Sequence, residues 1–421
     1  MIVDLAYGKQ GLKVELPNDG VTVIAPAFQP ELENVGQALL DALRQPIGTK
    51  PLKELVKPGQ RVAIAFSDLT RPQPRKEMLR ALLDELAHVP AENITLINGL
   101  GTHRPNTPDE LVEMLGADLV RDYHVVQSEC HDMANMTLVG TLPSGAKLYI
   151  HRAFVEADVK ILTGFIEPHL FAGFSGGPKG MMPGIAALET VMANHNYERL
   201  ASPKATWGFT HGNPVWEEIL AAAEMVGIDF IFNVAINRDK AITHVVAGDL
   251  KQAHAEGISY VRANAMTPVP HLYDVVITTN SGYPLDLNLY QGIKGVSAAA
   301  QIGKPGGAIL LAAECWDGIP EHGEFAALLR EHASAQELLQ TISQPGYSRQ
   351  DQWQAQILAQ TLLKARVFVY SDHLSDEQLR EALVQPCRDI SQWLAERKAE
   401  FGEDVSICVM PEGPMTIPYL A

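Results

Sequence analysis

The stretch from Gly164 to His195 (GFIEPHLFAGFSGGPKGMMPGIAALETVMANH) gathers residue types that can move protons beside an anion. It contains His169, a glycine-rich loop that carries Lys179, and His195 at the end of an expected helix. Histidine titrates near neutral pH, and glycines let backbone N–H groups approach an anion closely. This combination predicts a site that holds an anionic cofactor and performs acid–base chemistry next to it.

The glycine-rich loop fits no standard nucleotide fingerprint. The Walker spacing is absent, and no GxGxxG pattern follows a strand here. Gly176 and Gly177 are candidates for cofactor contact through their backbone. The segment around Ser175 matches GxSxG literally, so a serine hydrolase is one alternative. Pro178 and Pro183 interrupt the helix start that a nucleophile elbow needs. A plain packing loop with a surface lysine is another interpretation of the same residues.

Polar loops follow three successive expected strands, at residues 61–66, 94–98 and 159–163. Side chains that can bind a ligand or transfer protons lie at or just beyond the ends of these strands: Asp68, Arg71, His103, His169 and Lys179. Ligands of parallel α/β sheets bind outside the carboxyl ends of the strands. The shared position of these side chains therefore favours one common site over separate incidental roles.

Each of these side chains suits a particular chemical task. His103 and His169 can serve opposite faces of one carbon, as a racemisation requires. Arg71 can grip a carboxylate through two parallel hydrogen bonds. Lys179 can neutralise a phosphate or form a covalent link to a cofactor. His195 is a candidate ligand for a soft metal, although HExxH and HxH patterns are absent and no four-ligand protein cage is evident.

The order of expected elements predicts an α/β fold with two domains, mainly parallel sheets and an active-site cleft between them. A proline-containing stretch without apolar periodicity, residues 265–270, suggests the boundary. We expect an N-terminal domain at residues 1–265 that carries the cofactor and acid–base residues, and a C-terminal domain at 266–421. In the second half, a helix expected to begin near Asp286 places Gln291 and Lys294 on one face.

Composition limits the classes of function. The 421 residues include 33 lysines and arginines against 50 aspartates and glutamates, a net charge of −17 that disfavours nucleic acid as a partner. No apolar run reaches the roughly 18 residues of a membrane span, and the start does not resemble a secretory signal. The four cysteines are widely spaced and are expected to be reduced thiols. These features indicate a cytoplasmic protein that acts on small molecules.

Five segments together resemble the nickel-dependent lactate racemase family, whose members are 2-hydroxyacid racemases and epimerases that use a nickel-pincer nucleotide. The matching segments are 68–72 (DLTRP), 101–105 (GTHRP), 167–195, 283–295 (YPLDLNLYQGIKG) and 351–354 (DQWQ). They occur in both halves of the chain, in the family's order. The resemblance implies an isomerase that inverts C2 of a 2-hydroxy acid.

The resemblance also implies a role for each matched residue. Lys179 would anchor the nickel-pincer nucleotide (pyridinium-3,5-bisthiocarboxylic acid mononucleotide nickel) covalently, and His195 would be the protein ligand of its nickel. His103 and His169 would be the paired acid–base residues, and Asp68 would help hold the cofactor or orient Arg71. The residues implied to contact the substrate are Arg71, Gln291, Lys294 and Trp353.

The implied mechanism is a reversible hydride transfer. One histidine takes the hydroxyl proton while C2 gives its hydride to the cofactor, and a transient 2-oxo acid forms. Hydride then returns to the other face, and the second histidine reprotonates the oxygen. A tethered cofactor also explains the absence of a dinucleotide fingerprint. The implied partners are a 2-hydroxy acid and separate cofactor-synthesis enzymes, while the oligomeric state stays open, a homodimer included.

One position departs from the family pattern. Lactate-active members usually carry histidine where this chain has Leu69. An apolar residue there leaves the substrate open among lactate, malate, 2-hydroxyglutarate, phenyllactate and sugar acids such as gluconate. A packing change at Leu69 with no effect on the substrate is an equal alternative. A non-catalytic protein that binds an organic anion or the cofactor is the alternative from another functional class, and the intact His103, His169, Lys179 and His195 argue against it.

Overall fold

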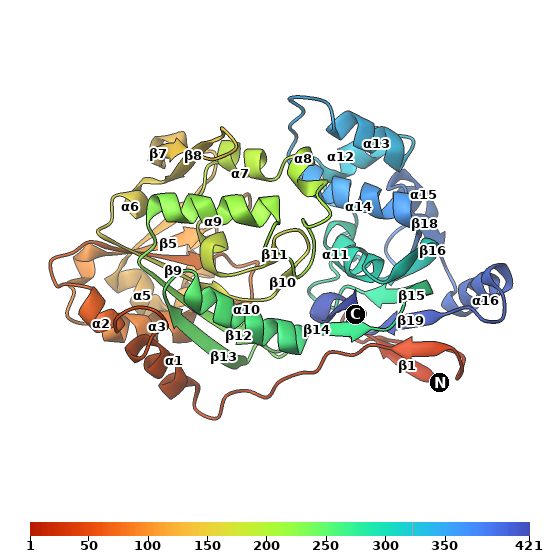
Figure 1. Cartoon of the computed structure of the whole chain (residues 1–421), viewed down its shortest axis with the longest axis horizontal. Helices are drawn as coiled ribbons and strands as arrows, with labels where there is room; N and C mark the ends of the chain where they lie inside the picture. The colour runs from red at the N-terminus through yellow and green to blue at the C-terminus, as the bar shows by residue number, and fades with distance from the viewer. Residues whose placement is uncertain (322) are drawn as a thin grey trace. The chain divides into compact units, whose positions relative to one another are not determined.

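The computed structural model describes residues 1–321 and 323–421 (Figure 1). By its contacts the chain forms two compact units. The N-terminal unit comprises Phe28–His195 and Lys204–Ala263, and the C-terminal unit comprises Met1–Ala27, Asn196–Pro203 and Asn264–Ala421. None of the helices in the described part of the chain has the length and apolar character that a bilayer crossing requires.

A mainly parallel sheet organises the N-terminal unit, in the order β13-β12-β9-β4-β5-β6. Its strands are β4 (Val62–Ser67), β5 (Ile94–Gly99), β6 (His124–Ser128), β9 (Val159–Phe165), β12 (Phe230–Ile236) and β13 (Ile242–Gly248). Only the pairing of β12 with β13 is antiparallel among these described strands. The three strands expected from the sequence are confirmed, each within two residues of its expected ends.

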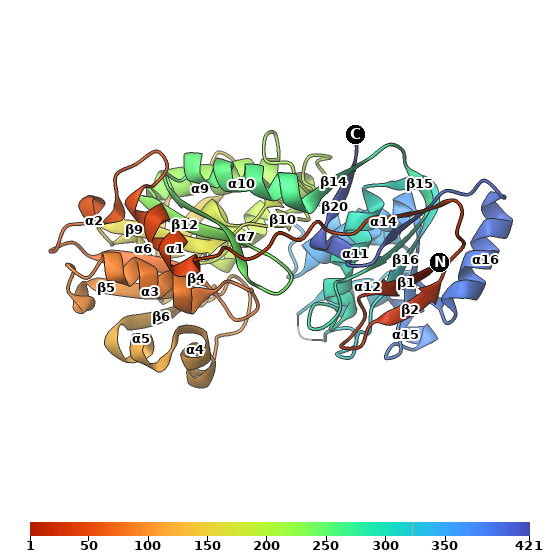
Figure 2. The same ribbon diagram turned by 90° about the horizontal axis from the view of Figure 1, so that it is seen from below.

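Helices cover both faces of this sheet. Figure 2 shows α9 (Pro214–Val226) and α10 (Gln252–Ala265) on one face, and α1 (Val35–Arg44) and α3 (Arg75–Glu85) on the other. Right-handed crossovers explain the arrangement, because α3 joins β4 to β5 while α9 joins β9 to β12 in the opposite direction along the sheet. The strands are consequently buried on both faces and read as continuous apolar runs.

Shorter elements complete the N-terminal unit. They are α2 (Leu52–Leu55), α4 (Pro108–Leu115), α5 (Ala117–Asp122), α6 (Arg152–Val155), α7 (Leu188–Asn194), the hairpin of β7 (Met136–Thr141) with β8 (Lys147–His151), the small hairpin of β10 (Pro168–His169) with β11 (Gly173–Phe174), and the 3₁₀ turn η3 (Gly177–Gly180). Helix α4 begins with a capping box at Thr107 and a proline in the first helical position.

The C-terminal unit is built on a second sheet, entirely parallel in its described strands, in the order β18-β17-β16-β15-β19-β3. Its strands are β3 (Val21–Val23), β15 (Tyr273–Thr279), β16 (Gly303–Ala312), β17 (Arg366–Tyr370), β18 (Gln385–Cys387) and β19 (Ile407–Met410). Its helices are α8 (Tyr197–Leu200), α11 (Leu289–Ala300), α12 (Phe325–Arg330), α13 (Ala335–Ile342), α14 (Gln352–Lys364), α15 (Asp376–Glu381) and α16 (Ile390–Phe401). Two small pairings, β1 (Ile2–Leu5) with β2 (Leu12–Glu15) and β14 (Met266–Val269) with β20 (Ile417–Leu420), also belong to it.

The division into units differs from the expected assignment of residues 1–265 to one domain. Strand β3 pairs with β19, with Val21 opposite Ile407, so the first 27 residues group with the C-terminal unit. Segment 196–203 joins that unit as well, where Gln356 Nε2 donates to the carbonyl of Tyr197 at 3.0 Å. Pairing between segments that are distant in the chain leaves no local signal in the sequence. Residues 1–27 and 196–203 were therefore expected in the N-terminal domain, because they precede the boundary at residue 265.

The helix expected near Asp286 begins three residues later. Its cap is Asn288, whose Oδ1 accepts from the backbone N–H of Gln291 at 3.0 Å. Asp286 is fully buried, and its Oδ2 accepts from the backbone N–H groups of Gly8 at 2.8 Å and Glu314 at 3.0 Å. Aspartate is a good capping residue, but here its carboxylate joins three loops of the C-terminal unit.

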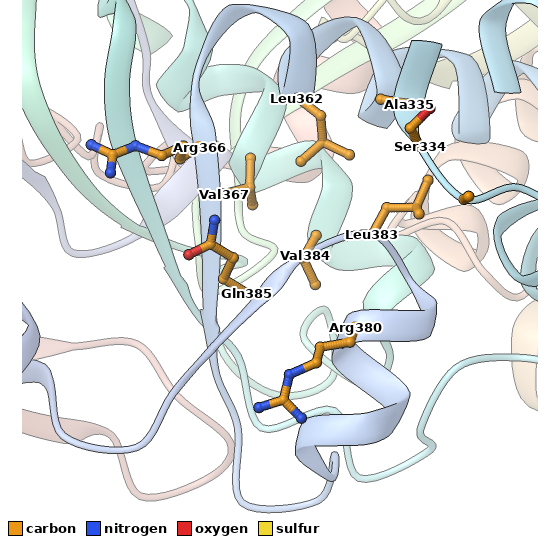
Figure 3. A pocket seen from close by; sticks show the side chains of 10 residues that line it. Ser334, Ala335, Leu362, Arg366, Val367, Arg380, Leu383, Val384 and Gln385 are labelled. Carbon is orange, nitrogen blue, oxygen red and sulfur yellow. The ribbon is translucent and has the colours of Figure 1, made fainter. Parts of the chain in front are cut away.

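A surface pocket of about 380 Å³ lies in the C-terminal unit, lined by segments of α13, α14, β17, α15 and β18 (Figure 3). Its two arginines are already paired, Arg366 with Glu400 and Arg380 with Asp376. None of the candidate site residues lines it. The chemistry predicted from the sequence therefore has to be sought elsewhere, at the ends of the strands.

Candidate functional site

The N-terminal sheet has a topological switch point between β4 and β9. From β4 the chain proceeds outward to β5 and β6, and it then returns to β9 on the other side of β4 and continues to β12. The loops that leave β4 and β9 at their carboxyl ends diverge here, and such a point is where open α/β sheets bind ligands. Asp68 and Arg71 follow β4, whereas His169 and Lys179 follow β9.

Asp68 and His103 form a hydrogen-bonded pair across neighbouring strands. His103 Nδ1 lies 2.9 Å from Asp68 Oδ2, and the Thr70 hydroxyl donates to Asp68 Oδ1 at 2.9 Å. The carboxylate is buried with 3% of its side chain exposed, while the imidazole is 36% exposed. A carboxylate opposite Nδ1 places the ring proton there in the neutral imidazole, so the lone pair lies on Nε2.

The environment of Asp68 keeps its carboxylate ionised. Burial alone would raise its pKa, but the hydrogen bond and charge of His103, the charge of Arg71 and the Thr70 hydroxyl together lower that pKa. The loop itself is held by Arg75, a residue that sequence reasoning missed. Its guanidinium donates to the carbonyls of Ser67, Gln73, Asp68 and Arg71. Burial lowers the pKa of Arg75 to about 10.

His169 lies on the short hairpin of β10 and β11, opposite Gly173. Its Nδ1 accepts from the backbone N–H groups of Ala172 at 3.2 Å and Phe171 at 3.4 Å. An accepting Nδ1 leaves the proton of the neutral ring on Nε2. His103 and His169 are thus held in opposite tautomers, one with a basic Nε2 and one with an Nε2–H.

Phe171 brings three predicted site residues together. Its ring meets the His169 ring edge to face with centroids 4.6 Å apart, and the His195 ring likewise at 4.9 Å. Lys179 Nζ lies 5.6 Å from the centre of the same ring. Asn213 fixes the Phe171 carbonyl through a 2.8 Å hydrogen bond. Sequence reasoning overlooked Phe171, although an aromatic residue two positions after a candidate histidine was a signal that could have drawn attention to it.

Lys179 lies in the 3₁₀ turn η3, after two glycines that have positive φ. Burial of its amine, with the positive charge of Arg71 as the second cause, lowers its pKa to about 7. A large fraction of the Lys179 side chains therefore carries a neutral, nucleophilic amine near neutral pH. That property fits an amine that becomes acylated or otherwise linked to a ligand.

The glycines before Lys179 are required by close packing. Gly177 has φ +49°, and a Cβ there would lie 2.6 Å from the ring of His254. Its N–H donates to Asn233 Oδ1 at 2.6 Å, so in this structure that amide is engaged within the protein. At Gly176, with φ +73°, a Cβ would lie 2.7 Å from Ile166. Contact of Gly176 and Gly177 with a cofactor remains a prediction.

The hydroxyl of Ser175 has a structural role. Ser175 Oγ donates to the carbonyl of Phe165 at 3.0 Å and accepts from the N–H of Glu167 at 2.9 Å. The nearby His254 contacts the backbone carbonyl of Ser175, at 2.9 Å from Nε2, and so does not serve the hydroxyl as a base. This geometry argues against the serine hydrolase alternative.

His195 directly follows the last residue of α7 and is buried, with 4% of the residue exposed. Burial, followed by the charge of Lys179, lowers its pKa to about 3, so the imidazole is neutral over the ordinary pH range. A neutral imidazole is the form that ligates metals. The described residues contain no group of three or more histidine, cysteine, aspartate or glutamate side chains that could hold a metal.

The remaining predicted residues belong to the C-terminal unit. Gln291 and Lys294 lie in the first turns of α11, which follows β15, and both are partly buried. Trp353 is buried at the start of α14, where its Nε1 donates to the Tyr290 hydroxyl at 3.2 Å. The structure thus brings the residues that follow β4, β5 and β9 together within one unit, and it places these three in the other.

Comparison with known proteins decides the family. The model of the lactate racemase N-terminal domain matches residues 7–208, and that of the lactate racemase C-terminal domain matches residues 270–417. A lactate racemase of Thermoanaerobacterium thermosaccharolyticum is 36% identical over 99% of this chain and 98% of its own. The chain belongs to the lactate racemase family. A second lactate racemase, of Lactiplantibacillus plantarum, is 34% identical over 98% of both chains.

Solved structures agree with the assignment to the lactate racemase family. The lactate racemase apoprotein of Thermoanaerobacterium thermosaccharolyticum superposes with a TM-score of 0.93 at 35% identity, covering 99% of this chain and all of that one. A protein from Thermotoga maritima, 18% identical with a TM-score of 0.66 over 92% of this chain and 98% of its own, shares the fold. This lactate racemase family member is accordingly an isomerase with an α/β fold of mainly parallel sheets, as the sequence predicted.

Proposed function

We propose that this isomerase inverts C2 of a small 2-hydroxy acid and that it does so with a nickel-pincer nucleotide attached at Lys179. Its relatives are named lactate racemase. The two histidines proposed as the acid–base pair, His103 and His169, are held in opposite tautomers, which supports the proposal. The observation that carries the proposal is the cluster around Phe171, which groups His169, Lys179 and His195. Domain division near residue 266 and an active-site cleft between the two domains are part of the same proposal.

The residues fit the cofactor that the family implies. Lys179 has an amine whose pKa of about 7 suits a covalent attachment, and His195 offers a neutral imidazole to nickel. A nickel held by a single protein ligand suits a cofactor that brings its own sulfur ligands. When bound, the nucleotide supplies a carbon that accepts a hydride from C2 and returns it. Arg71, whose charge reaches both Asp68 and Lys179, is positioned beside these groups.

The protein's own residues then move the hydroxyl proton. His103 accepts it at Nε2, because Asp68 holds the ring proton on Nδ1 and stabilises the positive ring that forms. His169 presents an N–H for the opposite face of the substrate. Arg71 binds the substrate carboxylate through two parallel hydrogen bonds. Gln291, Lys294 and Trp353 are proposed to complete the substrate contacts from the C-terminal unit.

The acid that is turned over is lactate or a relative with a longer side chain. Leu69 stands where the family's lactate-active members usually carry histidine, and it is 38% exposed next to the Asp68–His103 pair. An apolar, accessible side chain at that position favours contact with an apolar part of a substrate. Comparing Leu69→His with the parent chain on lactate, malate and phenyllactate would test this proposal, and an unchanged ranking of the three acids would refute it.

The decisive experiment is intact-mass spectrometry with nickel analysis, on protein produced together with the cofactor-synthesis enzymes. We expect a mass addition localised to Lys179 and about one nickel per chain, as a single-ligand site requires. Loss of optical rotation of a 2-hydroxy acid would then establish racemisation. An unmodified Lys179 without nickel under these conditions would overturn the cofactor proposal and favour an anion-binding protein. Size-exclusion chromatography of the same sample would decide whether the protein is a homodimer.

A further inference from the structure

Two buried polar side chains, Asn194 and Glu218, are linked to His195 by hydrogen bonds. Asn194, the last residue of α7, is fully buried, and its Nδ2 donates to the Val215 carbonyl at 3.2 Å and to Glu218 Oε2 at 3.0 Å. Glu218 lies on α9 and is itself only 5% exposed. Its carboxylate is thus removed from solvent on the side of α9 that faces α7.

These contacts fix which way the Asn194 amide points. A backbone carbonyl and a carboxylate can only accept, so the amide NH₂ must face Val215 and Glu218. The amide oxygen consequently faces His195, where Asn194 Oδ1 lies 3.0 Å from Nδ1. An acceptor at that distance requires a donating Nδ1–H, and the neutral ring then has its lone pair on Nε2.

The same helix supports the rest of the cluster. Asn213 caps α9 by accepting from the N–H groups of Val215 and Trp216, and it also donates to the Phe171 carbonyl. Phe171 in turn packs against the His195 ring. One end of α9 therefore sets both the hydrogen-bond partner of His195 and the ring that lies against it. Two independent contacts on one imidazole fix its rotation as well as its tautomer.

We propose that Asn194 and Glu218 are positioning residues that hold His195 in its Nδ1–H tautomer and direct Nε2 to the nickel of the cofactor. The inference rests on the proposed function in so far as His195 is the nickel ligand. The buried carboxylate of Glu218 polarises the Asn194 amide, which makes its oxygen a stronger acceptor and His195 a more basic ligand. A merely structural asparagine would tie α7 to α9 without setting the state of the ring.

Protein without cofactor provides the first test. In ¹⁵N-histidine protein at neutral pH, long-range ¹H–¹⁵N correlation distinguishes protonated from unprotonated ring nitrogens, and His195→Gln identifies the signals by their loss. We expect a protonated Nδ1 and an unprotonated Nε2. Glu218→Gln keeps an acceptor for Asn194 Nδ2 and should preserve this pattern. Asn194→Leu removes the acceptor for Nδ1 and should give a mixed or Nε2–H ring. An Nε2–H ring in the parent chain, or the parental pattern in Asn194→Leu, would overturn the inference.

Nickel release provides the second test, on protein that carries the cofactor. Metal-site partners of this kind typically change affinity roughly 10- to 100-fold when removed. We expect Asn194→Leu to release nickel to a chelator at least about tenfold faster, and Glu218→Gln, which retains an acceptor for Nδ2 but not the charge, to show a smaller increase. Equal release from all three proteins would overturn the inference. A parent chain that takes up no nickel would refute the proposed function, while the ring measurement would still decide the tautomer.

Discussion

Nδ1 of His103 lies 2.9 Å from Oδ2 of Asp68, and the two residues follow neighbouring parallel strands. Asp68 thereby fixes the tautomer of His103, the proposed acid–base residue, and offers a negative charge to the ring once it is protonated. The sequence left open whether Asp68 holds the cofactor or orients Arg71, and this contact adds a role for it in positioning His103.

Removal of that charge should slow the reaction. General acid–base catalysis contributes typically 10²- to 10⁴-fold, so we expect Asp68→Asn to lower kcat by roughly 100-fold or more, with a smaller change in KM. Asp158→Asn removes a carboxylate from the exposed pair with Arg61 and should leave the rate unchanged. Steady-state racemisation rates of the three proteins measure the effect. Equal rates for Asp68→Asn and the parent chain would refute the assigned role.

Lys179 should react with amine reagents at an unusually low pH. Its pKa of about 7 predicts that acetylation of the cofactor-free protein reaches half its maximal rate near pH 7. Arg71→Gln removes a positive charge that lowers this pKa, so its midpoint should move to higher pH. Lys251, whose pKa is raised by Glu224, should react only at much higher pH and serves as an internal reference. Peptide mass spectrometry after brief labelling gives each midpoint, and equal midpoints for Lys179 and Lys251 would contradict the prediction.

The same shift has a consequence for stability. Lys179 binds its proton less tightly in the folded chain than in the unfolded one, whose ordinary value is 10.5. Between about pH 7 and 10.5 the unfolded state carries the extra proton, so the Lys179 contribution to stability rises with pH over that window. Lys179→Met should remove this slope from the pH dependence of urea unfolding. An unchanged slope would show that the lysine amine is not buried as the structure has it.

His254 should make the N-terminal unit sensitive to acid. It is buried and stacks on Trp216, and burial lowers its pKa to about 4 although its bond to Ser175 opposes the shift. Because the unfolded chain takes up the proton below about pH 6.5, stability is lost as pH falls from 6.5 towards 4, by about 2 kcal/mol at pH 5.

A conservative substitution isolates this effect. His254→Gln retains a donor for the Ser175 carbonyl but cannot titrate, so the stability difference between pH 7 and pH 5 should shrink by that amount. His131→Gln, which replaces an exposed histidine, should behave like the parent chain. Denaturant midpoints at the two pH values provide the measurement, and identical pH dependence of all three proteins would dispose of the prediction.

Gly173 should tolerate no side chain. It has φ +79°, and a Cβ there would lie 2.1 Å from the carbonyl oxygen of Phe209. Gly145 has a comparable φ of +88° but nothing within 4 Å of its Cβ position, so it isolates the backbone strain. We expect Gly145→Ala to cost about 1 kcal/mol and Gly173→Ala at least about 3 kcal/mol, because backbone atoms must move apart. Thermal unfolding of both variants measures the two losses of stability. Equal losses would mean that the hairpin that carries His169 repacks without cost.

Much of the N-terminal unit could be predicted from local patterns. The buried apolar runs of β4, β5 and β9 mark strands by themselves, and the polar residues that follow them mark the carboxyl edge of a parallel sheet. The resemblance supplied the roles of the residues. The tautomers of His169 and His195 could not be predicted from the sequence. They depend on the backbone N–H groups near His169 and on the amide of Asn194 next to His195, and only the folded chain determines where these groups point.

Several residues that hold loops in place could not be recognised from the sequence. Arg75 resembles any helix-start arginine, yet its guanidinium binds four carbonyls of the loop that carries Asp68. Asn213 looks like an ordinary cap, yet it also holds Phe171. A helix was expected to begin near Asp286, but the cap is Asn288, and the Asp286 carboxylate accepts from two backbone N–H groups of distant loops. Such contacts join segments that are far apart in the chain.

The pairing of β3 with β19 gives the two units different places in the order of synthesis. The N-terminal unit lies wholly within residues 28–263, so the ribosome completes it while much of the chain is still to be made. The C-terminal sheet cannot add β3 until β19, close to the chain's end, has emerged. Residues 21–23 have no strand partner until β19 has been synthesised. Before β3 pairs with it, the edge of β19 can pair with strands of other nascent chains.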